Sequence, residues 1–160
     1  MTLKTSTKDT IKFAFIFIMF GALFTSCSNI YSRYESVPDM QWTKADAKQF
    51  TFDIKEEADY DMIFALRYAT LFPYPVLQIT IEIAHPDGTE FEKDAAFQII
   101  GDNGKYIGEV AGNMWDFESP FSEGQHLKPG KYKVTYTHAM PSEPVIAVME
   151  LGLIIRKTEK

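Results

Sequence analysis

The stretch Leu77-Gln78-Ile79-Thr80-Ile81-Glu82-Ile83 alternates apolar and polar side chains without a break. Successive side chains of a β-strand point to opposite faces, so this alternation predicts a strand with one buried face and one solvated face. Pro86-Asp87-Gly88 follows, and there proline presets φ while glycine tolerates a positive φ. Residues 77–88 therefore predict a strand that ends in a tight turn.

The same period of two recurs on both sides of this strand, in residues 50–54, 60–68, 91–99, 115–118 and 132–136. Residues 145–156 are apolar on both faces as far as Glu150, which suits a strand that is covered on both sides. No sustained spacing of three or four, the helical period, appears after residue 48. About seven or eight strands joined by turns predict an all-β fold, an antiparallel β-sandwich. We favour a jelly-roll-like arrangement, and an immunoglobulin-like one is the alternative that periodicity leaves open.

An apolar run at residues 13–24 is preceded by three lysines and followed by Ser26 and Cys27, the only cysteine. A basic segment, an apolar segment and a small-residue processing site form a secretory signal. Residues 13–24 would span about 18 Å as a helix, too short for a bilayer core of about 30 Å. Since Cys27 has no disulfide partner, its place at the processing site predicts a bacterial lipoprotein with lipid on Cys27. A cleaved signal that leaves a free cysteine is the alternative.

The sequence therefore divides into a lipoprotein signal peptide at 1–26, a lipidated tether and lead-in at 27–47, and a β-sandwich domain at 48–160. The formal net charge is −6 at pH 7, and no basic run follows the signal peptide. Nucleic acids need clusters of lysine and arginine for their phosphates, so we expect no nucleic-acid partner. The expected attachment is to a membrane, through the lipid on Cys27.

Catalytic and metal-binding motifs are missing from the sequence. The histidines are His85, His126 and His138. None has metal-ligand spacing, and no phosphate loop or nucleophile motif occurs, so we expect no cofactor, no metal and no catalytic residue. Within a strand, Asp59 and Asp61 would lie about 7 Å apart, as would Asp116 and Glu118, a spacing that inverting glycosidases use. Both pairs fall on polar faces, which favours solvated carboxylates over an active site. We expect His138 to be a hydrogen-bonded histidine at a strand end.

Four aromatic residues fall at element edges or in loops: Trp42, Tyr74, Tyr106 and Trp115. Exposed rings at such places stack on sugars or contact partner proteins. The alternative is that these rings cover the ends of the sandwich. We therefore select these four residues as candidate contacts for a partner or a glycan.

Several short sequence blocks occur in this chain in the same order as in a known protein family. They are Phe24-Thr25-Ser26-Cys27, which resembles the lipobox, Trp42, Leu66-Arg67, Phe72-Pro73-Tyr74-Pro75, Pro86-Asp87-Gly88, Gly104-Lys105-Tyr106-Ile107-Gly108, Pro129-Gly130-Lys131-Tyr132, Ala139-Met140 and Leu151-Gly152-Leu153. In this order the chain resembles the gliding motility lipoprotein GldH family of the Bacteroidetes. The resemblance implies a cell-envelope lipoprotein associated with gliding over surfaces, and it carries no established catalytic residues.

We expect a non-enzymatic accessory or scaffold lipoprotein of the envelope that binds envelope proteins, among them the gliding machinery. In Bacteroidetes lipoproteins an acidic cluster after the lipidated cysteine marks surface export. No such cluster follows Cys27, so the expected position is the outer membrane, lipid-anchored with a palmitate-type chain and facing the periplasm. A glycan-binding β-sandwich module is the alternative, and a glycan-cleaving enzyme is a third hypothesis.

Overall fold

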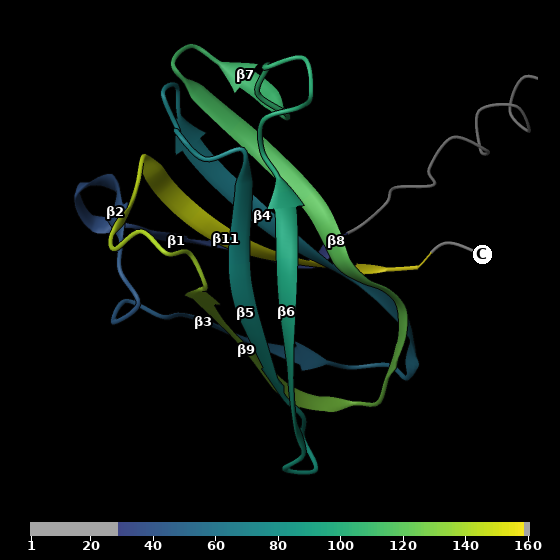
Figure 1. Ribbon diagram of the computed structural model, residues 1–160. Helices are drawn as coiled ribbons and strands as arrows, with labels where there is room; N and C mark the ends of the chain where they lie inside the picture. Colours follow the sequence, from purple (N-terminus) through teal and green to yellow (C-terminus); the bar gives the residue numbers. More distant parts are fainter. Residues whose placement is uncertain (1–28, 159–160) are drawn as a thin grey trace, which may run out of the picture.

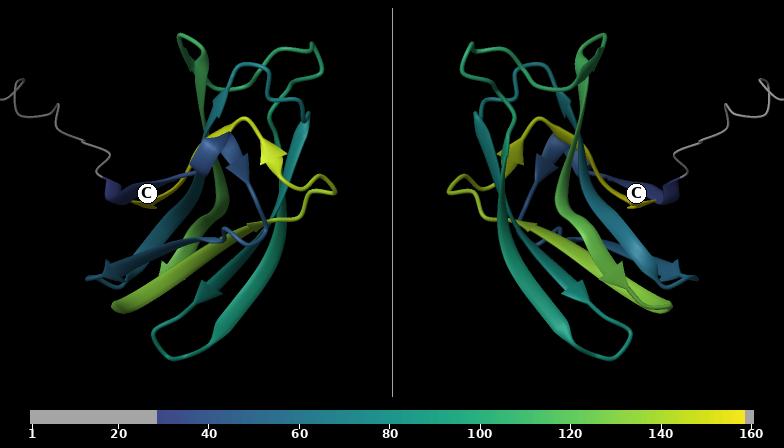
Figure 2. Two further views of the ribbon diagram at one scale, coloured as in Figure 1. Left: turned by 90° about the vertical axis from the view of Figure 1, so that its left-hand side faces the viewer. Right: turned by 90° about the vertical axis from the view of Figure 1, so that its right-hand side faces the viewer.

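The computed structural model describes residues 29–158, which form two antiparallel sheets packed face to face (Figures 1 and 2). The elements in chain order are β1 (Asn29–Ser36), the single 3₁₀ turn η1 (Pro38–Met40), β2 (Gln41–Trp42), β3 (Lys48–Ile54), β4 (Ala58–Ala69), β5 (Val76–Ala84), β6 (Glu90–Gln98), β7 (Glu109–Ala111), β8 (Met114–Leu127), β9 (Gly130–His138), β10 (Val145–Ile146) and β11 (Val148–Lys157). No helix in residues 29–158 has the length and apolarity to cross a membrane. The predicted signal peptide and Cys27 lie outside the described residues.

The strand order identifies the sandwich as a jelly roll. One sheet has the order β1-β11-β4-β8-β7, the other β3-β9-β5-β6, and β2 pairs separately with β10. Among the long strands only β5 and β6 are both consecutive in the chain and paired, since the other connections cross between the sheets. This crossing is typical of two interlocked Greek keys, whereas an immunoglobulin sheet pairs its first two strands. The predicted antiparallel β-sandwich is confirmed, and its strand order is that of the jelly roll, which the sequence analysis favoured over an immunoglobulin-like arrangement.

The core fills the space between the two sheets. β5 buries Leu77, Ile79 and Ile81, as its alternation predicts. Phe64 of β4 stacks on Phe97 of β6 with ring centroids 4.5 Å apart, and meets Tyr136 of β9 edge-on at 5.3 Å. One ring therefore connects both sheets, through aromatic pairs that each contribute about 0.5–1.5 kcal/mol beyond the area they bury.

The N-terminal part of the sandwich differs from the sequence-based division. Residues 29–42 fall in the expected lead-in, but β1 pairs with β11 over its whole length and β2 pairs with β10. The sandwich therefore begins at Asn29 rather than at residue 48. β1 is an edge strand whose side chains are mostly exposed. It thus lacks the apolar period that reveals a strand in a sequence.

The two ends of the sandwich are formed by different loops and turns. At the apolar end lie the β4–β5 loop (70–75) and residues 99–113 with β7, which are uppermost in Figure 1, together with η1 and the β2–β10 pair, with β2 at the left of that view. At the opposite, polar end lie the β3–β4, β5–β6 and β8–β9 turns and the last residues of β11. Asn29 pairs with Arg156 near the end of β11, so the first described residue lies at the polar end.

Candidate functional site

The apolar end carries most of the exposed large apolar side chains in the described part of the chain. They are Met40, Leu71, Val76, Ile107, Val110, Met114 and Ile146, and those elsewhere are Ile30, Tyr34 and Phe91. Leu71 is 81% exposed and Val110 is 62% exposed. Single exposed apolar residues are ordinary, but seven of the ten in the described residues lie at this one end, and gathered apolar exposure is typical of interaction sites. We therefore take the apolar end as the candidate functional site.

The rings selected from the sequence support this surface from below. Tyr106 and Trp115 have centroids 5.4 Å apart with planes at 51°, and Trp115 stacks on the buried Tyr68 at 6.5 Å. The Tyr106 hydroxyl accepts a hydrogen bond from the Leu71 amide (2.9 Å) and donates one to the Phe72 carbonyl (3.2 Å). Both the hydroxyl and the ring of Tyr106 thus hold the β4–β5 loop. The rings of Tyr106 and Trp115 are half-buried and tilted, so they do not form a flat exposed platform.

The other two selected rings lie at the same end. Trp42 is fully buried, and its Nε1 donates to the carbonyl of Asp46 at 3.0 Å. Tyr74 is half-buried and meets Phe72 edge-on at 5.3 Å. The four selected aromatic residues therefore lie at the same end, where ring contacts through Tyr68 and Phe72 link Tyr74, Tyr106 and Trp115, whereas Trp42 contacts His138. Trp42 belongs to the core, and the partly exposed rings are the ones that reach the surface.

The backbone at the apolar end is strained. All non-glycine residues with positive φ in the described chain lie here: Asp39 (53°), Met40 (54°), Leu71 (85°) and Ala147 (66°). Each such residue costs about 1–2 kcal/mol, and such conformations cluster at functional sites. At Ala147 the neighbouring strand helps to maintain this conformation, since the Ala69 amide donates to the Ala147 carbonyl at 3.0 Å. Sequence reasoning missed this feature because none of these residues is glycine.

A depression of about 480 Å³ opens beside η1 at the apolar end. Met40, Met114 and Met149 line it together with Arg67 and Glu150. We call it the methionine pocket. Its methionines come from η1, β8 and β11, which are distant in the chain. Sequence periodicity therefore carries no signal for this pocket.

Arg67 is the positively charged residue in the lining of the methionine pocket. Its Nε donates to Asp116 Oδ1 at 2.8 Å, and its Nη1 donates to Glu150 Oε2 at 2.7 Å. The hydrogen bond to Asp116 raises the pKa of Arg67, which stays charged. Two carboxylates thus face one guanidinium, and Asp39 adds a further negative charge at the rim. The sequence analysis placed Asp116 on a solvated polar face, whereas the structure pairs it with Arg67.

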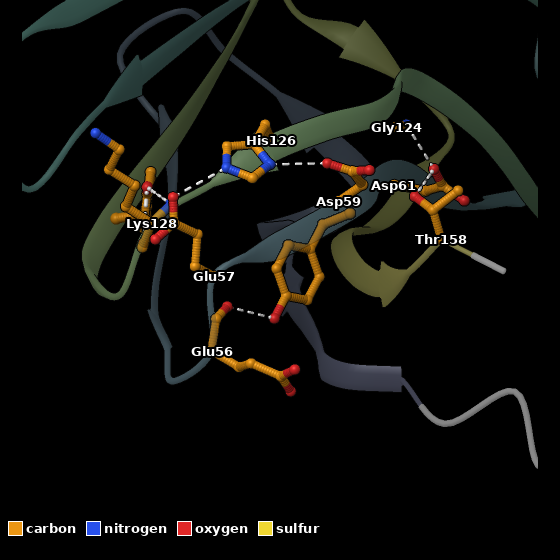
Figure 3. Close-up of polar contacts among 10 residues, drawn as sticks. Glu56, Glu57, Asp59, Asp61, Gly124, His126, Lys128 and Thr158 are labelled. Carbon is orange, nitrogen blue, oxygen red and sulfur yellow. Dashed lines mark hydrogen bonds and ion pairs between the residues drawn. The ribbon is translucent and has the colours of Figure 1, made fainter. Parts of the chain in front are cut away.

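His126 is the centre of a polar cluster at the opposite end (Figure 3). Its Nδ1 lies 2.9 Å from Asp59 Oδ1 and its Nε2 lies 3.1 Å from Glu57 Oε1. Hydrogen bonds to Asp59 and then to Glu57 raise the pKa of His126. The two carboxylates lie on opposite sides of the ring, so they do not converge on one point. Nearby, Asp61 accepts hydrogen bonds from the Gly124 amide and the Thr158 hydroxyl, both at 2.8 Å.

These contacts indicate that the polar cluster stabilises the fold and does not catalyse a reaction. Both ring nitrogens of His126 are engaged by carboxylates, which leaves neither free to act as a base towards a nucleophile. Within residues 29–158, no group of three or more histidine, cysteine or carboxylate side chains is arranged to hold a metal ion. The Asp59–His126 contact follows from their pairing across β4 and β8, a register that the sequence does not display.

His138 differs from its expected role as a rim histidine. It is 2% exposed, and its ring lies 5.3 Å from that of Trp42. Its Nε2 is 3.0 Å from Glu143 Oε2, but within the described chain neither ring nitrogen has the geometry of a hydrogen bond. Burial lowers the pKa of His138 and outweighs the opposing attraction of Glu143. The ring is therefore a neutral core side chain.

Comparisons with known proteins bear on the family. The GldH lipoprotein family matches residues 29–155. The gliding motility lipoprotein GldH homolog of Christiangramia forsetii (strain DSM 17595 / CGMCC 1.15422 / KT0803) is 29% identical over 130 residues, which cover 79% of each chain. Among solved structures, TmCBM61 in complex with beta-1,4-galactotriose is 10% identical over 86% of this chain and 94% of that one, with a TM-score of 0.34. The infectious bursal disease virus VP2 subviral particle is 14% identical over 81% of this chain and 33% of that one, with a TM-score of 0.32.

The family match extends from the first residue of β1 almost to the end of β11, so it covers the entire jelly roll. The resemblance noted in the sequence is confirmed by this match and by the curated relative. This chain belongs to the GldH lipoprotein family, whose curated relative is named for gliding motility.

Proposed function

We propose that this protein is a non-enzymatic accessory lipoprotein of the gliding machinery, which presents its apolar end to an envelope protein. The lipid on Cys27 holds it to the outer membrane on the periplasmic side. The observation that carries the proposal is the concentration of exposed apolar side chains at the end of the sandwich opposite Asn29. An apolar surface turned away from the anchor is free for a protein partner.

The position of β1 supports this orientation. Cys27 precedes Asn29 by two residues, which span at most about 7 Å, so the polar end lies close to the lipid. β1 has 8 residues and runs from the polar end towards η1. At a rise of about 3.4 Å per residue, its length sets the apolar end about 25 Å from the anchor. This separation supports an apolar end that the bilayer does not cover.

The arrangement of polar groups supports a binding role over catalysis. Asp116 is paired with Arg67, Asp59 is paired with His126, and Glu118 is exposed on β8. None of these carboxylates faces a partner across a cleft, as a glycan-cleaving enzyme requires. The glycan-binding alternative has less support, since Trp42 is buried and the other rings are tilted or half-buried.

Metabolic labelling tests the anchor. Cells expressing the wild-type chain or Cys27→Ala are fed an alkyne analogue of palmitate, and the isolated protein is examined for label. We expect label and outer-membrane fractionation for the wild type, and loss of both for Cys27→Ala. Unlabelled wild-type protein would refute lipid anchoring.

Photo-crosslinking tests the contact. A benzophenone amino acid replaces Leu71 at the apolar end or, as the matched control, Phe91 on β6 near the polar end, which is 55% exposed. In gliding cells we expect Leu71 to crosslink to an envelope protein and Phe91 to give little product. Equal yields from both positions, or no product from Leu71, would contradict the proposed docking end.

A further inference from the structure

The methionine pocket has both an apolar lining and an excess of negative charge. We propose that it binds a partner segment that carries a large apolar side chain beside a lysine or arginine. This proposal rests on the proposed function, because it names the chemistry of the partner at the apolar end.

The lining is suited to an apolar side chain. Met40 is 45% exposed and Met114 is 36% exposed, although methionine is an apolar residue. Methionine has three rotatable bonds and a polarisable sulfur, so such side chains adapt to the shape of an inserted group. Burial of these two side chains together with a partner residue would remove apolar surface from water on both sides.

The backbone that carries the lining is held in place before binding. The Val37 amide donates to the Met149 carbonyl at 2.8 Å, which ties the start of η1 to β11. The Met40 amide donates to the Val37 carbonyl at 3.3 Å, and Met40 itself keeps a φ of 54°. A preset backbone with adaptable side chains lowers the ordering cost of binding.

The charges of the pocket favour a lysine or arginine in the partner segment. The single guanidinium of Arg67 is shared by Asp116 and Glu150, whose side chains remain 42% and 27% exposed. Asp39 also lines the pocket, where Arg67 is the one cation, and the ion pairs of Arg67 are to Asp116 and Glu150. Like-charge contact costs several kcal/mol at an interface, so a carboxylate next to the inserted side chain is disfavoured and a cation is favoured.

The experiment uses the full lipidated chain in gliding cells. A benzophenone amino acid replaces Met114, and the crosslinked partner peptide is sequenced by mass spectrometry. The same chain is compared with Glu150→Lys, which reverses a pocket charge, and with Glu92→Lys, a matched change on exposed β6 outside the pocket. Thermal melting of each purified variant shows that it folds.

We expect a captured segment with a large apolar residue next to a lysine or arginine. Glu150→Lys should lower its yield about tenfold, the effect of about 1.4 kcal/mol, while Glu92→Lys leaves it unchanged. A captured segment without a basic residue, a segment of this same chain, or a yield that Glu150→Lys leaves intact would overturn the proposal. If Leu71 still crosslinks in those cases, the docking end stands and only the assigned chemistry fails. If Leu71 gives no product either, the proposed function fails as well.

Discussion

Replacement of Gly108 by alanine should destabilise the apolar end far more than replacement of Gly104, although the two glycines are four residues apart. Gly108 has a φ of +131°, and a Cβ there would overlap the carbonyl oxygen of Asp116 and lie 3.0 Å from its carbonyl carbon. Gly104 has a φ of +73°, and a Cβ there would have nothing within 4 Å. The comparison therefore separates conformational strain from a close approach of two backbones.

The expected magnitudes follow from these contacts. A non-glycine residue in such a backbone region costs about 1–3 kcal/mol, and this cost applies at both positions. At Gly108 the overlap involves the backbone of β8, which no side-chain rotation relieves, so overpacking adds about 1–3 kcal/mol. We expect Gly108→Ala to lower the free energy of unfolding by about 2–6 kcal/mol, and Gly104→Ala by about 1–3 kcal/mol. A domain of this size has about 5–15 kcal/mol in all.

Urea denaturation of the purified domain measures the two losses, and hydrogen exchange locates them. We expect Gly108→Ala to lose protection at Ile107 and along β7, because the displaced segment no longer presents the Ile107 carbonyl to the Tyr68 hydroxyl, which donates to it at 2.8 Å. Equal losses of stability for the two variants would refute the close approach of this segment to β8. Unchanged exchange at residues 107–111 would refute it as well.

Three further predictions concern particular side chains. Hydrogen bonds raise the pKa of His126, so the stabilisation that the protonated ring gives is present below the unfolded pKa of about 6.5 and is lost as pH rises through the folded pKa. NMR titration should show that Asp59→Asn lowers the pKa of His126, and an unchanged value would contradict the pairing. Burial lowers the pKa of His138, so stability should fall as pH drops from about 6.5 towards the folded pKa, and urea midpoints at several pH values should show a flatter dependence for His138→Phe. A double-mutant cycle of Phe64→Leu and Phe97→Leu should give a coupling of about 0.5–1.5 kcal/mol in urea unfolding, and no coupling would contradict the stacked pair.

The sequence by itself determined the features that depend on neighbours along the chain. The alternation at residues 77–83 predicted β5, and its buried residues are the expected ones. The turn at Pro86-Asp87-Gly88 falls between β5 and β6, where the sequence predicts it. In a half-buried strand the side chains alternate between apolar and polar because they alternate between the core and solvent. This local pattern was sufficient to predict an all-β fold and a sandwich.

Features that depend on residues distant in the chain were decided only by the tertiary structure. β1 has no apolar period, since it is an edge strand, and its place in the sheet comes from pairing with β11 at the other end of the chain. The methionine pocket likewise joins η1, β8 and β11, which only the jelly-roll order brings together. The aromatic residues were recognisable in the sequence, but their gathering at one end and the burial of Trp42 were not. Strand order and packing are global properties, because each contact is formed by segments whose separation in sequence carries no periodic signal.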